Sequence, residues 1–225
     1  MRFLMLGGEF RMDITSERLQ RTVVLFYGYR DGILMSPTFG VVVKKGGRYF
    51  AVSVAHTIED RERFEVWTGV HSDVAKNFDM CTAAKCLVAA ASDAAQTAES
   101  DDIMAVPLDD YTGDAFGFVV SDVGLLRPVL ITCLDFAPDD GQILHNMLDG
   151  QAGLVEQEGS FHLRLTSQGK AGMSGAPVVV DIGNGKFGLV GLYTGESRTS
   201  PLTITATAEH ANVVKIGQLM STLPI

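Results

Sequence analysis

A serine enclosed by glycines is the residue in this chain best suited to chemistry. Ser174 lies in the segment Gly172-Met173-Ser174-Gly175-Ala176-Pro177, which runs into an apolar stretch at 178–180. Glycine permits the sharp turn that this pattern indicates, and the turn directs the backbone N–H groups of residues 172 and 174 into one small space. A hydroxyl beside two such donors suits attack on a carbonyl group, because the donors can hold the resulting oxyanion. Ordinary hairpin loops also carry this pattern.

Residues that could activate this serine occur in the first half of the chain. His56 ends the apolar run 51–55, and Asp102 directly precedes the apolar run 103–106. A part-buried carboxylate needs a hydrogen-bond donor, and an imidazole N–H supplies one. Asp101 is the competing acid. A histidine bonded to a backbone carbonyl and an acidic turn before a strand are the structural alternatives. Each of the three residues lies at the end or start of an apolar run. This setting predicts a triad of Ser174 as nucleophile, His56 as base and Asp102 as acid, with an oxyanion hole at Gly172 and Ser174.

The segments around these residues have the composition of short β-strands. Runs rich in Val, Ile, Phe, Tyr and Thr alternate with glycine-containing turns, which predicts an all-β fold. N-cap chemistry around 13–19 predicts a short N-terminal helix, and the spacing over 213–219 predicts a short C-terminal helix. The expected strands are 23–27, 39–43, 49–54, 64–68, 103–106, 118–120, 128–133, 161–165, 177–180, 188–193 and 202–208.

The strands fall into two series, which predicts two β-barrels. A polar, turn-forming segment begins at Asp109 and divides the series almost in half. The expected organisation is an N-terminal arm and helix over 1–21, a first barrel over 22–108, a linker over 109–124 and a second barrel with the C-terminal helix over 125–225. The apolar start of the arm is too short for a secretory signal and could form an edge strand or a surface-packed arm.

Composition narrows the classes of function. The chain has 225 residues, is 46% hydrophobic and 20% charged, and carries a formal charge of −9, which argues against general nucleic-acid binding. No apolar run is long enough for a membrane span. The three cysteines show no metal-ligand spacing, and their odd number favours a reducing compartment such as the cytoplasm. We expect no metal and no cofactor.

The order and setting of the three residues resemble the chymotrypsin-like serine peptidases. The segments Val54-Ala55-His56, Asp102-Ile103-Met104-Ala105-Val106 and Gly172–Pro177 are similar to that family's three motifs. The resemblance extends over about 22–216 and implies two six-stranded antiparallel barrels and endopeptidase activity. Lys170-Ala171-Gly172-Met173-Ser174-Gly175 resembles the 3C-like proteases of positive-strand RNA viruses, and the segment 189–195 resembles those of arterivirus and sobemovirus type.

The departures from the family pattern are informative. Met173 replaces the aspartate that pairs with a new amino terminus in zymogen-activated members, and the histidine-loop disulfide is missing. The resemblance therefore implies processing of a viral polyprotein in the host cytoplasm, with a cellular or bacterial trypsin-like peptidase or a non-catalytic peptide- or RNA-binding module as alternatives. The substrate is expected to lie extended along 191–195. Tyr193 stands where viral relatives have a pocket histidine, and a core position is its alternative. The other pocket candidates are Gln168, Thr194, Gly195, Thr205 and Thr207.

Overall fold

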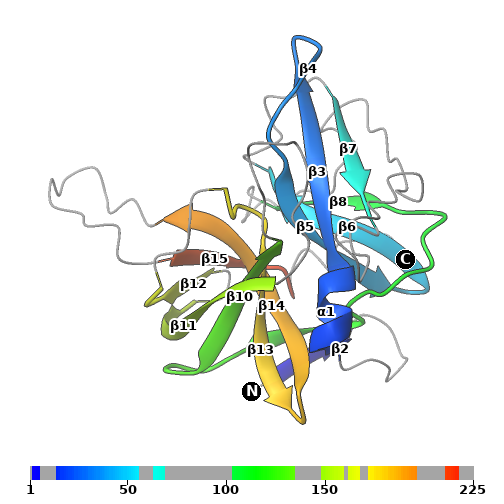
Figure 1. Cartoon of the computed structure of the whole chain (residues 1–225). Helices are drawn as coiled ribbons and strands as arrows, with labels where there is room; N and C mark the ends of the chain where they lie inside the picture. The colour runs from blue at the N-terminus through cyan, green and yellow to red at the C-terminus, as the bar shows by residue number, and fades with distance from the viewer. Residues whose placement is uncertain are drawn as a thin grey trace, which may run out of the picture.

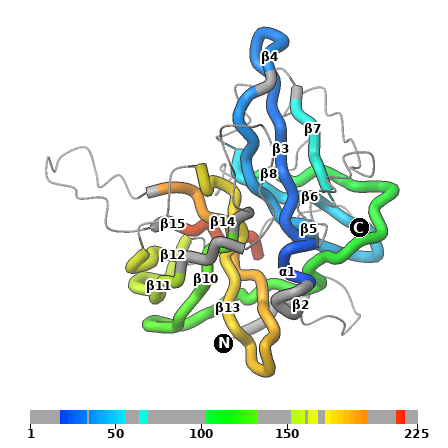
Figure 2. Tube along the Cα trace, in the orientation of Figure 1, coloured from blue at the N-terminus to red at the C-terminus, as the bar shows by residue number. Residues whose placement is uncertain are grey.

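The computed structural model describes most of the two predicted strand series. Figure 2 traces the chain and sets the remaining segments in grey. The described residues are 2–5, 14–55, 63–68, 103–134, 148–159, 162–167, 172–196 and 211–217.

The first lobe is a curled antiparallel sheet, shown at the upper right of Figure 1. Its strands are β3 (Val23–Arg30), β4 (Ile33–Leu34), β5 (Thr38–Lys45), β6 (Arg48–Val54), β7 (Arg63–Trp67) and β8 (Ile103–Pro107). They follow the order β7-β3-β5-β6-β8, and the short β4 extends the hairpin between β3 and β5. Alternate residues of these strands, such as Val24, Phe26 and Val66, fill the concave side. The described part of this lobe is a five-strand half-barrel.

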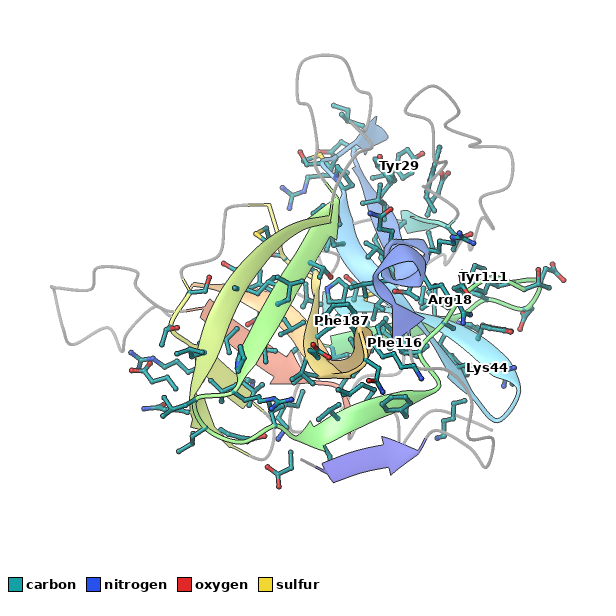
Figure 3. The ribbon with its side chains drawn as sticks, turned by 60° about the horizontal axis from the view of Figure 1, so that its bottom comes forward. Arg18, Tyr29, Lys44, Tyr111, Phe116 and Phe187 are labelled. Atoms are coloured by element: carbon teal, nitrogen blue, oxygen red, sulfur yellow. The ribbon has the colours of Figure 1, made fainter. Side chains whose placement is uncertain are left out.

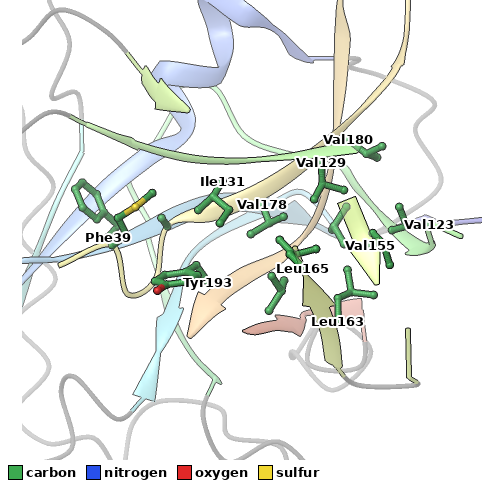
Figure 4. Close-up of a cluster of buried hydrophobic side chains, with 14 of the residues drawn as sticks. Phe39, Val123, Val129, Ile131, Val155, Leu163, Leu165, Val178, Val180 and Tyr193 are labelled. Atoms are coloured by element: carbon green, nitrogen blue, oxygen red, sulfur yellow. The ribbon is translucent and has the colours of Figure 1, made fainter. Parts of the chain in front are cut away.

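The second lobe is a closed six-strand barrel. Its strands are β10 (Pro128–Leu134), β11 (Leu148–Glu158), β12 (His162–Leu165), β13 (Pro177–Gly183), β14 (Lys186–Glu196) and β15 (Ala211–Lys215). The order is β14-β13-β10-β11-β12-β15, and pairing of β15 with β14 closes the ring. Closure removes free sheet edges and surrounds an apolar core, part of which is shown in Figure 4.

The N-terminal segments extend the second barrel. Beyond the barrel, β14 pairs with β2 (Ile14–Thr15) and, in parallel, with β9 (Phe118–Asp122). β1 (Arg2–Met5) pairs antiparallel with β9 and forms the last strand of this sheet. The helix α1 (Ser16–Thr22) connects β2 to β3. The described parts of the N-terminal arm are an edge strand, one of two forms that the sequence left open, and the short helix that the sequence predicted.

A charged contact holds α1 to the segment between the lobes. Arg18 pairs with the Asp114 carboxylate through both Nε, at 2.8 Å, and Nη2. The Tyr111 hydroxyl donates to the Asp114 carbonyl oxygen at 2.9 Å. Figure 3 shows Arg18 and Tyr111 beside each other to the right of the helix. Charge-assisted hydrogen bonds of this kind are stronger than neutral ones, so the connection between the lobes has a fixed path.

A second polar cluster fixes the end of that connection. The Glu158 carboxylate accepts the N–H groups of Val123 and Gly124, at 2.9 and 2.8 Å, and the Lys215 ammonium at 2.9 Å. Burial alone would raise the pKa of Glu158, but these hydrogen bonds outweigh it and lower the pKa. The carboxylate thereby ties the start of the second barrel to β11 and β15.

The all-β, two-barrel architecture predicted from the strand series is confirmed. The helix predicted over 213–219 is wrong for 213–215, which belong to β15. Val213 and Val214 are fully buried and pair with both β12 and β14, so sheet pairing overrides a weak helical spacing. The sequence also missed β11: Leu154, Glu156 and Gln157 are exposed, and of the buried positions Gly153 has no side chain, so the alternation carries little apolar signal.

Candidate active site

Ser174 lies in a tight turn before β13. Ala176 N–H donates to the Met173 carbonyl oxygen at 2.8 Å, which closes a four-residue turn with Ser174 and Gly175 at its centre. Gly175 has φ +81° and Gly172 has φ +86°, a region that favours glycine. The two glycines thus allow the chain to reverse around Ser174, as their spacing indicated. We call residues 172–176 the serine turn.

Both lobes hold the serine turn. Phe39 of β5 donates its N–H to the Ser174 carbonyl oxygen at 3.1 Å. On the other side, Gly175 N–H donates to the Tyr193 carbonyl oxygen at 2.8 Å, and Tyr193 N–H donates to Ala176 at 2.9 Å. Figure 4 shows Phe39 and Tyr193 at the same end of the apolar cluster. The backbone of Ser174 is therefore fixed at the junction of the two lobes.

Ser53 is a buried support for this arrangement. Its Oγ donates to the Phe39 carbonyl oxygen at 2.6 Å. A Cβ added at Gly175 would lie 2.8 Å from Ser53 Oγ and would overlap the Phe39 carbonyl. No side chain fits at residue 175, so glycine is required there for space as well as for its φ. Neither Ser53 nor Phe39 was predicted from the sequence; the signal for Ser53 was a lone hydroxyl inside the apolar run 51–55.

The serine turn presents a hydroxyl and two backbone N–H donors. Ser174 is half-buried, whereas its neighbour Met173 is 3% exposed and packs into the core with Phe39 and Tyr193. Among the described residues, none accepts a hydrogen bond from the N–H of Gly172 or of Ser174. Two unoccupied backbone donors beside a hydroxyl can stabilise negative charge that develops on a carbonyl oxygen.

The other two triad candidates lie outside the described residues, as does Asp101, but the strands that lead to them are described. His56 follows Ala55 at the end of β6, and Asp102 precedes Ile103 at the start of β8. β6 and β8 are paired, with Val54 opposite Ile103. The chain therefore enters the His56 segment and leaves the Asp102 segment at the same end of two adjacent strands.

The predicted pocket residues have mixed outcomes. Tyr193 is 2% exposed and packs in the core, which is the alternative that the sequence left open. Thr194 and Gly195 are half-buried and follow it in β14. Pairing of β13 with β14 ends at Leu192, so no described strand lies beside 194–196 on that edge. Gln168, Thr205 and Thr207 lie outside the described residues, and their role stays a prediction.

The described residues contain no candidate metal centre and no candidate membrane-spanning helix. No group of three or more His, Cys, Asp or Glu side chains among them could hold a metal ion. In the same part of the chain, no helix is long and apolar enough to cross a membrane.

The fold is that of chymotrypsin-like proteases. A serine endoprotease from Yersinia pestis superimposes with a TM-score of 0.58 at 14% identity, over 91% of this chain and 62% of that one. This chain thus spans less than two thirds of that protein's length. A catalytically active tobacco etch virus protease, in complex with product, gives a TM-score of 0.56 at 11% identity, over 92% and 78% of the two chains. No protein-family model and no curated protein matches the sequence.

Proposed function

We propose that the protein is a serine endopeptidase with Ser174 as nucleophile, His56 as base and Asp102 as orienting acid. The serine turn carries the proposal: a half-buried serine with two unoccupied backbone donors, held between the lobes of a chymotrypsin-like fold. The pairing of Val54 with Ile103 supports it. The chain leaves β6 shortly before His56 and enters β8 directly after Asp102, at the same end of these two paired strands.

The chemistry follows from these groups. His56 accepts the hydroxyl proton while Ser174 Oγ forms a bond to the peptide carbonyl carbon, and the N–H groups of Gly172 and Ser174 hold the oxyanion. The proton then passes from His56 to the leaving amine as the C–N bond breaks. Water then gives a proton to His56 and bonds to the acyl carbon; the bond between that carbon and Ser174 Oγ breaks, and His56 returns the proton to Oγ. Asp102 fixes the imidazole tautomer and stabilises its cation.

The substrate binds as an added strand in this proposal. The edge of β14 that continues from Tyr193 past the serine turn is where an extended peptide adds to the sheet. An antiparallel peptide on this edge runs from residue 196 towards Tyr193. Its scissile bond then reaches Ser174, and the residues C-terminal to that bond continue towards Phe39.

The finer proposal is processing of a viral polyprotein. It rests on the resemblance of 170–175 to viral 3C-like proteases and on Met173, whose buried apolar side chain replaces the zymogen aspartate. Digestion of peptides that span the chain's own flanking junctions, compared with casein, separates this role from that of a general cellular or bacterial peptidase. Selective cleavage at the junctions supports it, and equal cleavage of casein contradicts it.

The peptidase assignment is tested by digesting a peptide library with the parent protein and the Ser174→Ala variant. We expect loss of several orders of magnitude in rate, because triad members act as a unit. Ser121→Ala, a half-buried serine on β9, is the matched control and should cut like the parent. Equal cleavage by Ser174→Ala would refute the assignment. Absence of cleavage by the parent would favour a non-catalytic binding module.

A further inference from the structure

Apolar side chains are exposed on the outer surface of the second barrel, over β10 and β11. Side chains alternate along both strands, and those that point inward, such as Val129 and Val155, belong to the core shown in Figure 4. The outward positions are apolar as well. They pair as Pro128 with Leu154 and Leu130 with Ala152, and all but the half-buried Leu130 are exposed. Together with the turn before β10 they form what we call the leucine face: Leu125, Leu126, Pro128, Leu130, Ala152 and Leu154.

The leucine face groups side chains that a surface usually keeps apart. Among the described residues, four large hydrophobic side chains are exposed, and three of them, Leu125, Leu126 and Leu154, lie here. Single exposed hydrophobic residues are ordinary, whereas grouped ones mark interaction sites. Leu130 also packs against the buried cluster that joins the two lobes, so the apolar surface continues outward from that contact.

Leu126 is held in a strained conformation in which its side chain is exposed. Its φ is +58°, in a region that leucine rarely adopts, and its side chain is 73% exposed. Its N–H donates to the Val155 carbonyl oxygen at 2.8 Å, and Glu158 accepts the N–H groups of Val123 and Gly124 just before it. Asparagine at this position would remove both the strain and the exposed apolar surface. Backbone strain of this kind is typical of functional sites, so the turn presents Leu126 as a preformed contact.

The strands under the leucine face cannot accept another strand. β10 pairs with β11 and β13, and β11 pairs with β10 and β12. Both backbone groups of Leu154 are used by Thr166: Leu154 N–H donates to Thr166 Oγ1, and Thr166 N–H donates to the Leu154 carbonyl oxygen, each at 3.0 Å. A partner can therefore bind here only through side chains. Its own backbone groups must be paired internally, as they are in a helix.

The dimensions of the leucine face also suit one helix. From Leu126 to Leu130 the face is about 14 Å long, and its two strands are about 10 Å wide. An α-helix is about 10 Å across and rises about 14 Å in two to three turns. A stable dimer would bury about 800 Å² on each copy, several times the outline of this face. The formal charge of −9 on each copy also disfavours self-association and attraction to an anionic membrane.

Charges beside the leucine face nearly balance, so the net charge of the chain decides which sign the partner carries. Arg164 pairs with Glu156 at 3.1 Å, and Arg127 donates to the Asp181 carbonyl oxygen at 2.8 Å. We propose that the leucine face binds an amphipathic α-helix of a partner polypeptide, with an apolar stripe at i, i+3, i+4 and i+7 and basic residues beside it. The stripe packs on the leucines, and the basic residues complement the charge of −9. Binding at this face does not require catalysis by Ser174.

The probe is a fluorescein-labelled peptide of about 14 leucine and lysine residues, with the leucines on one helical stripe. It is titrated with the Ser174→Ala protein, so that peptidase activity does not consume it, and fluorescence anisotropy is followed. One control peptide has the same composition with its leucines spread around the helix, and another has glutamate in place of lysine. We expect the striped lysine peptide to bind about 10-fold more tightly than either control. Equal binding of all three, or binding of none, would overturn the proposal.

Variants locate the binding on the leucine face. In the Ser174→Ala background, Leu126→Asn and Leu154→Thr should each weaken binding of the striped lysine peptide about 10-fold. Ile33→Asn is the matched control and should leave binding unchanged, because Ile33 is a 66% exposed hydrophobic residue on β4 of the first lobe. Unchanged binding in every leucine variant that folds, or an equal loss in Ile33→Asn, would overturn the assignment. Since asparagine tolerates positive φ, Leu126→Asn should also keep or raise the thermal midpoint; a lower midpoint would contradict strain at Leu126.

Two further measurements identify other occupants of the leucine face. A dimer that Leu126→Asn dissociates in sedimentation would assign the face to a second copy. Flotation with phosphatidylcholine–phosphatidylserine vesicles that Leu126→Asn abolishes would assign it to a membrane, and either result would overturn the helix. A monomer that does not float but binds the striped peptide supports the proposal. Because none of these measurements needs cleavage, this proposal and the peptidase proposal fail independently.

Discussion

Replacement of Gly175 by alanine tests the packing of the serine turn against the first lobe. An alanine Cβ would lie 2.8 Å from both the Phe39 carbonyl carbon and Ser53 Oγ, inside ordinary contact distance, and closer still to the Phe39 oxygen. The turn must therefore move away from β5. Movement disrupts two hydrogen bonds of the turn: Phe39 N–H to Ser174 and Gly175 N–H to Tyr193.

The expected cost has two parts. Alanine at positive φ costs about 1 kcal/mol, and two disrupted hydrogen bonds cost about 1 kcal/mol each, so unfolding free energy should fall by about 3 kcal/mol. For a chain of this size that is about 6 to 12 °C in Tm. Gly47→Ala is a matched control, because Gly47 also has φ +81° but has no atom within 4 Å of an added Cβ. It should lose only about 1 kcal/mol.

The assay is urea unfolding of both variants beside the parent, with peptidase rate as a second measurement. A turn displaced by about 1 Å should lower the rate of Gly175→Ala about 100-fold, whereas Gly47→Ala should retain the parent rate. Equal losses of stability in the two variants would refute the close packing of the serine turn on Phe39.

Three further predictions concern other parts of the account. Ser53→Ala should lower unfolding free energy by about 1 to 2 kcal/mol and slow peptide cleavage, because Phe39 loses its buried donor; an unchanged urea midpoint would contradict this support role. Glu158 has a lowered pKa when folded, so its stabilisation is present above its unfolded pKa and is lost as the pH falls through the folded pKa. The Tm difference between the parent and Glu158→Gln should thus shrink from pH 7 to pH 3; a constant difference would contradict it. Asp102→Asn should lower kcat about 10⁴-fold and Asp101→Asn little, and the reverse order would assign the acid to Asp101.

Some strands could be predicted from the sequence because their local composition favours a strand and their side chains are buried in the fold. The strands at 39–43 and 49–54 carry β-branched and aromatic residues flanked by turn glycines, and they form the centre of the first lobe. β15 and β11 were not accessible in this way. Their pairing is decided by distant strands, which override the helical spacing at 213–219 and the polar composition of 148–158.

The candidate site likewise combines features that the local sequence predicts with features that depend on distant contacts. The positive φ values of Gly172 and Gly175 follow from the local pattern around Ser174. The support from Phe39 does not, because Phe39 and Ser174 are more than 100 positions apart, and Ser53 acts through Phe39. Burial of Tyr193 likewise depends on closure of the barrel, so sequence alone left both a core and a pocket position open.

Covalent labelling of the native protein with a fluorophosphonate, followed by peptide mass spectrometry, tests the central claim most directly. We expect one adduct on Ser174 of the folded parent and no adduct on the Ser174→Ala variant. The Ser121→Ala variant should carry as much adduct on Ser174 as the parent. A folded parent that gives no adduct on Ser174, or an adduct on another serine that persists in Ser174→Ala, would contradict the claim that the serine turn presents an activated nucleophile.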